Sequence, residues 1–212
     1  MSKNRTLFAL GAVLLVLFAI FVWAVQNVNV APIGPDGSEV GFAGINGKVR
    51  DLIGVNQSWY EITELLGYGV LLVAAGFGLL ALFQAIKRKS LKIDGDLWGL
   101  LLFYVVVGGI YLFFEKYVVN YRPIITEDGL EASFPSSHTL LSLCIMGSAS
   151  LQFSHRIKKF RTPVLVISLL IMVIIVVGRL LSGVHWFTDI LGSVLLSAGL
   201  VMIYAAVQRK LQ

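Results

Sequence analysis

Long blocks of apolar residues constrain this chain more than any other feature of its sequence. The first block, residues 7–26, holds no charged residue, and similar blocks follow along the rest of the chain. A helix needs ~20 such residues to cross the ~30 Å hydrocarbon layer of a bilayer. Only 14% of the 212 residues are charged, fewer than an ordinary soluble domain carries. We therefore expect a multi-pass membrane protein that forms a single domain, residues 1–212.

Six apolar segments have the length of membrane-spanning helices. They cover residues 7–26, 60–86, 97–120, 136–153, 163–181 and 186–207. Pro123 follows the third segment and stops it, whereas Pro163 suits the first turn of the fifth. The predicted fold class is all-α, a bundle of six transmembrane helices.

Two segments near the N-terminal end need separate interpretation. Lys3 and Arg5 before an apolar run resemble a secretory signal peptide, but the run reaches Val25 without a small-residue cleavage site, so we expect a retained helix. In the following polar loop, residues 40–53 place apolar side chains near helical spacing. Two interpretations stay open for them, a short helix on the membrane surface or an ordinary solvated loop.

Basic residues predict the orientation of the helices. With the N-terminus inside, twelve of the seventeen Lys and Arg residues fall in cytoplasmic segments. The positive-inside rule therefore places both termini in the cytoplasm of a cell (plasma) membrane protein. It also explains the net charge of +5, since these residues anchor the helices and contact anionic membrane lipids. We accordingly expect no nucleic-acid partner.

Three short polar segments lie at the predicted outer face. They are residues 116–123 (KYVVNYRP), 135–138 (PSSH) and 179–189 (RLLSGVHWFTD). The guanidinium forks of Arg122 and Arg179 suit phosphoryl oxygens. Of the two histidines in these segments, His138 and His185, one can attack phosphorus and the other can protonate the departing oxygen.

The spacing of residues within these segments also favours a phosphate-binding site. His185 and Asp189 are four residues apart, so on a helix the carboxylate accepts a hydrogen bond from one ring nitrogen and leaves the other free. At the predicted start of the fourth helix, Ser136 and Ser137 offer hydroxyls beside free backbone N–H groups, which favour an anion.

Together, the three segments resemble the signature of the type 2 phosphatidic acid phosphatase superfamily. That signature reads Lys-x6-Arg-Pro, then Pro-Ser-Gly-His, then Ser-Arg-x5-His-x3-Asp, and the resemblance covers residues 116–189. It implies that His185 forms a phosphohistidine oriented by Asp189 and that His138 protonates the leaving group. It also implies that Arg122, Arg179 and Ser136 hold phosphate, without a metal or other cofactor.

Three positions depart from that signature. Ser137 replaces a glycine, and Gly178 replaces the serine before Arg179. Only five residues separate Lys116 from Arg122, so Glu115 occupies the family's lysine position. Because Arg122 precedes a proline, the helical phase is not decisive there. We therefore still predict that Lys116 reaches the phosphate by extending its flexible side chain.

The remaining acidic residues are interpreted as structural. Glu61 and Glu64 are expected to be charges at the N-terminus of the second helix, with a catalytic role as the alternative. Glu127, Asp128 and Glu131 are expected in a solvated loop, with a part in substrate gating or a cation-bridged diphosphate contact as the alternative. No metal site is predicted.

The function expected from this sequence is hydrolysis of a lipid phosphate or diphosphate. Among substrates, undecaprenyl diphosphate is favoured because an outer active site suits recycling of that carrier, with phosphatidylglycerol phosphate and phosphatidate as alternatives. Two other functions stay open: a lipid phosphotransferase, since a phosphohistidine also reacts with alcohols, and a non-catalytic lipid-phosphate binder or scramblase.

Overall fold

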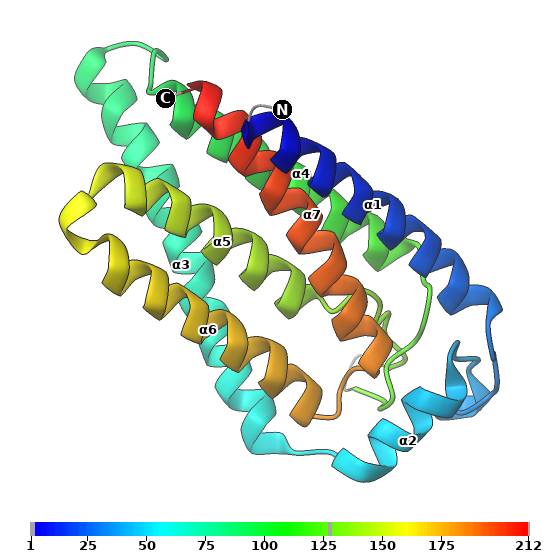
Figure 1. Ribbon diagram of the computed structural model, residues 1–212. Helices are drawn as coiled ribbons and strands as arrows, with labels where there is room; N and C mark the ends of the chain where they lie inside the picture. Colours follow the sequence, from blue (N-terminus) through cyan, green and yellow to red (C-terminus); the bar gives the residue numbers. More distant parts are fainter. Residues whose placement is uncertain (1–2, 127–128, 212) are drawn as a thin grey trace.

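The computed structural model describes residues 3–126 and 129–211, and within them every regular element is helical. Outside the helices, backbone pairing in these residues amounts to isolated bridges. The predicted all-α class is therefore confirmed. The six long helices form a bundle, with the short helix α2 across one end (Figure 1). In chain order, the long helices and the short helix α2 are α1 (Lys3–Asn27), α2 (Ala43–Ile53), α3 (Gln57–Arg88), α4 (Gly95–Lys116), α5 (Ser137–Arg156), α6 (Arg161–Leu181) and α7 (Phe187–Leu211).

Five of the six long helices are long and apolar enough to cross a membrane. Helix α5 is not among them because it carries many polar residues, including Thr139, Ser142, Ser148 and Gln152. All four of these side chains are buried within the bundle. A sixth span at α5 therefore stays a prediction.

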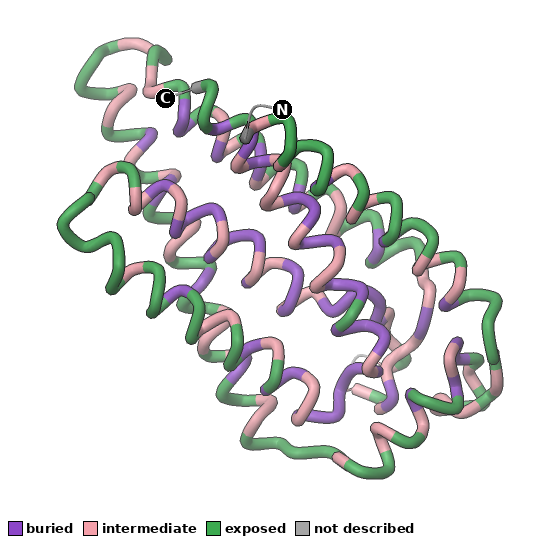
Figure 2. The backbone as a smooth tube through the Cα atoms, viewed as in Figure 1, coloured by how far each residue is buried: buried purple, intermediate pink, exposed green. Residues whose placement is uncertain are grey.

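The bundle is apolar on its outer surface and partly polar inside, the reverse of a soluble protein. Leu72, Val105 and Leu112 are exposed on the outer faces of their helices, at 73%, 70% and 63%. Buried residues instead follow α5 and α7 (Figure 2). Helix α7 is central, since 56% of its most apolar 18-residue segment is buried, whereas the corresponding share is 17 to 22% in the other four candidate spans. This distribution suits a lipid surrounding, in which small and polar residues mediate helix contacts.

Two predicted helix boundaries were wrong in ways that affect the site. The second long helix begins at Gln57, because the Asn56 side chain accepts a hydrogen bond from the backbone N–H of Trp59 (3.1 Å) and caps it. The third ends at Lys116 and does not reach Asn120. Asn120 instead lies in the loop after α4, where its backbone oxygen accepts a hydrogen bond from the backbone N–H of Ser133 (2.9 Å).

The first loop contains a helix, which agrees with one of the two interpretations of residues 40–53. Helix α2 is attached to the start of α7 through Asn46, a fully buried residue. The Asn46 amide donates to Thr188 Oγ1 (3.0 Å), and its oxygen accepts from the backbone N–H of Thr188 (3.2 Å). These bonds hold α2 across the end of the bundle. Its placement on a membrane surface stays a prediction.

Helices α1 and α7 approach each other closely through two glycines. A Cβ atom on Gly11 would lie 2.8 Å from the carbonyl oxygen of Gly199, and one on Gly199 would lie 2.8 Å from Leu15 Cδ2. Small residues at such crossings let helix backbones pack together without a hydrophobic driving force.

Gly199→Leu should therefore separate α1 from α7 and destabilise the protein by about 1–3 kcal/mol. Thermal unfolding in detergent measures this as a lower Tm. Gly76→Leu is the matched control, because an added Cβ at Gly76 meets nothing within 4 Å. Equal Tm values for the two variants would contradict the close α1–α7 packing.

Candidate active site

The end of the bundle opposite the chain termini gathers the three polar segments that the sequence singled out (Figure 1). Arg122 comes from the loop after α4, and His138 from the first turn of α5. Arg179 ends α6, and His185 lies in the turn before α7. The predicted convergence of these segments is therefore observed, and the first turns of α3 join them.

His185 is buried and electrostatically held in its neutral form. Its exposed fraction is 5%, and neither ring nitrogen has a hydrogen-bond partner among the described residues. Burial lowers the pKa of His185 well below its ordinary value, and the positive charges of Arg122 and Arg179 lower this pKa further. A neutral imidazole with an unshared electron pair is the form that attacks phosphorus.

Asp189 lies beside His185, but not in the helical pairing expected from the spacing. His185 precedes the helix, and its Nδ1 is 3.7 Å from Asp189 Oδ2, beyond hydrogen-bond length. Asp189 Oδ2 instead accepts the backbone N–H of Trp186 (2.8 Å), and Oδ1 accepts from the Asn120 amide (3.3 Å). The Asp189 carboxylate thus connects the turn that holds His185 to the start of α7, and it lies close to the imidazole ring without a hydrogen bond to it.

The second histidine faces a carboxylate that the sequence analysis had interpreted otherwise. His138 Nε2 lies 3.1 Å from Glu64 Oε1, and the same oxygen accepts a hydrogen bond from Arg179 Nη2 (2.8 Å). Glu61 and Glu64 are not first-turn charges, because α3 begins earlier than predicted and has no acidic residue in its first turn. Sequence reasoning gave Glu64 a catalytic role only as the alternative, because this residue lies outside the three segments that carry the motifs.

The two arginines differ in exposure. The Arg179 side chain is completely buried, and its Nε and Nη1 have no hydrogen-bond partner among the described residues. Arg122 is partly exposed, with Nε 3.1 Å from Glu131 Oε2. Glu131 is therefore an ion-pair partner and not only a solvated loop residue. Glu127 and Asp128, predicted in the same loop, lie outside the described residues.

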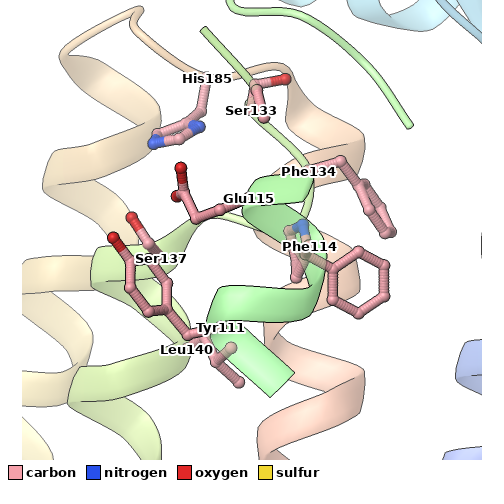
Figure 3. Close-up of a pocket in the computed structure, with 10 residues that line it drawn as sticks. Tyr111, Phe114, Glu115, Ser133, Phe134, Ser137, Leu140 and His185 are labelled. Atoms are coloured by element: carbon pink, nitrogen blue, oxygen red, sulfur yellow. The ribbon is translucent and has the colours of Figure 1, made fainter. Parts of the chain in front are cut away.

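A narrow cavity of ≈10 Å³ lies beside His185, with Ser133, Ser137 and Tyr111 among its lining residues. Figure 3 shows the carboxylate of Glu115 in this cavity, pointing toward the His185 ring. Lys116 is exposed at the last residue of α4 and does not line the cavity. Its contact with phosphate stays a prediction, and the α4 residue with a charged side chain that lines this cavity is Glu115.

The serines lie where the start of the fourth predicted helix was expected. Ser136 is the N-cap residue of α5, and its buried hydroxyl has no hydrogen-bond partner in the described part of the chain. Ser137 lines the cavity beside His185. Packing explains the glycine at position 178, since a Cβ there would lie 2.6 Å from Thr63 Cγ2 of α3. A serine at that position would push α3 away from the site.

The family model that matches this chain supports the motif assignment. Residues 96–212, more than half of the chain, match the model of the PAP2 superfamily. The chain belongs to the PAP2 superfamily. This confirms the resemblance carried by the three segments, and it leaves α1 to α3 of this PAP2 protein outside the matched residues.

A solved structure shares the whole fold. The PAP2 protein is similar to the crystal structure of a transmembrane PAP2-type phosphatidylglycerolphosphate phosphatase from Bacillus subtilis, with a TM-score of 0.65 and 18% identity. The alignment covers 99% of this chain and 96% of that chain. At this identity the similarity shows the fold alone. A comparison with curated protein sequences finds no match.

His185→Ala should reduce phosphate release from a lipid phosphate to below roughly 1% of wild type, because we predict that this ring supplies the attacking nitrogen. Asp189→Asn should cost about 10²- to 10⁴-fold, because an amide cannot stabilise the ring in the same way. Both are measured as inorganic phosphate released by purified protein in detergent. His155→Ala serves as the control, since His155 is exposed at the opposite end of α5. Retained activity in His185→Ala would exclude this residue as nucleophile.

Proposed function

We propose that this PAP2 protein is a membrane phosphatase that hydrolyses a lipid phosphate or diphosphate through a phosphohistidine at His185. One observation carries the proposal. A buried imidazole, whose pKa is lowered by burial and by two arginines, lies at the same end of the bundle as a second histidine, and Nε and Nη1 of Arg179 have no hydrogen-bond partner among the described residues. A non-catalytic phosphate binder needs the arginines but neither histidine.

The reaction begins with phosphate held by Arg122 and Arg179. His185 Nε2, the nitrogen farther from Asp189, attacks phosphorus and forms a P–N bond while the P–O bond to the lipid breaks. His138 gives its proton to the departing oxygen. A water molecule then attacks the phosphohistidine, His138 takes a proton from that water, and the P–N bond breaks to release inorganic phosphate.

A second cavity supports a lipid as the group that carries the phosphate. It has a volume of ≈240 Å³ and reaches from Glu64 and His138 down between α3 and α5. Its walls below the polar end include Leu71 and Leu141, and Tyr68 at its side is 62% exposed on the outer surface of the bundle. Such a groove suits a headgroup at the histidines and a hydrocarbon chain beside α3.

Undecaprenyl diphosphate is the substrate that we propose within this class. The distribution of basic residues supports an outer active site, and an outer site suits recycling of this carrier. Phosphatidylglycerol phosphate and phosphatidate are the alternatives to be measured beside it.

A substrate panel tests the proposed activity. Purified protein in detergent should release inorganic phosphate from at least one of these three lipids, with excess EDTA present, and vanadate should block the release because its pentavalent geometry resembles phosphoryl transfer. Among residues 3–126 and 129–211, no group of three or more His, Cys, Asp or Glu side chains is placed to hold a metal ion. Activity that disappears on chelation and returns with a metal would contradict the metal-free mechanism. Transfer to an added alcohol in place of water would identify a phosphotransferase.

The side of the membrane is tested by cysteine labelling. Ile125 is exposed in the loop before α5, and Lys158 is exposed at the opposite end of the bundle. In a Cys144→Ser background, Ile125→Cys should react with a membrane-impermeant thiol reagent in intact cells. Lys158→Cys should react only after the membrane is opened. The reverse pattern would place the site in the cytoplasm and remove the argument from carrier recycling.

A further inference from the structure

One face of α3 forms a wall of the candidate site. Tyr60, Thr63, Glu64 and Gly67 follow the i, i+3, i+4, i+7 spacing that places side chains on one face of a helix. All four lie against the arginine region or the first turn of α5, as described below. This helix precedes the residues matched by the family model, so the wall is a feature of this chain that the three motifs do not include.

The upper part of the wall holds Arg179. The guanidinium carbon lies 5.1 Å from the centre of the Tyr60 ring, a cation–π distance. Thr63 packs against the backbone of Gly178, next to the arginine. With Nη2 bound to Glu64, the guanidinium is held in one orientation, and its Nε and Nη1 have no other partner among the described residues. Those two groups are then available to phosphoryl oxygens.

The lower part of the wall holds His138. A Cβ on Gly67 would lie 2.9 Å from His138 Cδ2, so only a glycine lets the ring lie directly against α3. Glu64, one turn earlier, lies 3.1 Å from Nε2 of the same ring. The Cδ2–Nε2 edge of the imidazole thus lies against α3, while its buried Nδ1 has no partner within the described residues.

The charges around His138 come from four elements. Burial is the largest effect that opposes protonation of the ring, Arg179 of α6 and the His185 ring before α7 add to it, and Glu64 of α3 favours protonation. Glu115 of α4 lines the adjoining cavity together with Ser137. Glu64 is the carboxylate beside the ring, 3.1 Å from Nε2, so its charge acts against the effect of Arg179.

We propose that Glu64 is a positioning residue for the phosphatase reaction: it orients His138 and Arg179 together and stabilises the imidazolium form of His138 that protonates the leaving oxygen. The inference rests on the proposed function. In the chemical step the proton passes from the His138 ring to the lipid oxygen as the P–O bond breaks, and the Glu64 carboxylate stays ionised. One carboxylate oxygen therefore aligns the phosphate-binding group and the proton donor.

Glu64→Gln tests this, because glutamine keeps the size and the acceptor oxygen but removes the charge. We expect kcat for a lipid phosphate to fall about 10- to 100-fold, with a smaller change in KM. The alkaline limb of the kcat profile should move to lower pH by about one unit, since the protonated ring loses its counter-charge. Glu64→Asp, which retains the charge, should recover part of kcat. The matched control is Glu61→Gln, because Glu61 is exposed one turn earlier and bonds only to Gln57 in the described residues.

A comparison of leaving groups separates proton donation from a merely structural role. p-Nitrophenyl phosphate releases a stable anion that needs little protonation, so Glu64→Gln should lose less activity on it than on a lipid alkyl phosphate. The ratio of the two rates in one preparation does not depend on how much of the variant is folded. Equal losses on both substrates, with an unmoved pH profile, would overturn the proposal.

The outcomes for Glu64 and for the proposed function are distinguishable. An active wild type in which Glu64→Gln behaves like Glu61→Gln would reject the role of Glu64 and leave the phosphatase intact. A wild type that releases no phosphate from any lipid or from p-nitrophenyl phosphate would reject the proposed function and this inference with it.

Discussion

A completely buried guanidinium governs the arrangement of this end of the bundle. Removing the Arg179 side chain from water is costly unless a carboxylate and further contacts compensate it. Glu64 supplies that carboxylate and Tyr60 supplies an aromatic face, both from α3. Helix α3 must therefore pack against the end of α6, and this close approach requires the glycine at position 178. The position of one charge thus determines the position of a whole helix.

The two histidines of the site have different surroundings, which suits two different roles. His185 lies in a buried turn near two cationic side chains, conditions that keep its ring neutral. His138, at the start of α5, lies against the carboxylate of Glu64 from α3. The environments come from separate elements, α3 for one ring and the α6–α7 turn for the other.

The membrane constrains where such chemistry can be placed. Polar and ionisable groups are costly in contact with lipid, so they lie inside the bundle or at its ends. Helix α5 shows the first case, since Thr139, Ser142 and Gln152 are buried within the bundle. The arginines and histidines of the site show the second. An apolar cavity between α3 and α5 then connects the polar end to the outer surface of the bundle.

The sequence by itself determined the helical class, most of the long helices and the three segments that meet at one end of the bundle. Apolar blocks are a local property of the chain, and the three segments carry their residue types at fixed spacing, so both are readable without a structure. His138, His185, Asp189, Arg122 and Arg179 accordingly meet at one end of the bundle. The early end of α4 was not readable, because residues after Lys116 pair with a segment further along the chain, as Asn120 does with Ser133, whereas the early start of α3 follows from the Asn56 cap, a local signal that was overlooked.

Only the tertiary structure decided which partners these residues have. Glu64 is far from the motifs in sequence, and only the packing of α3 against α5 and α6 brings its carboxylate to His138 and Arg179. The end of α4 likewise turns Glu115, and not Lys116, toward His185. Helical spacing overestimated the His185–Asp189 contact, because the histidine lies before the helix and the carboxylate accepts a backbone N–H. Residue types follow from sequence, whereas charge pairing depends on distances between helices that no local pattern specifies.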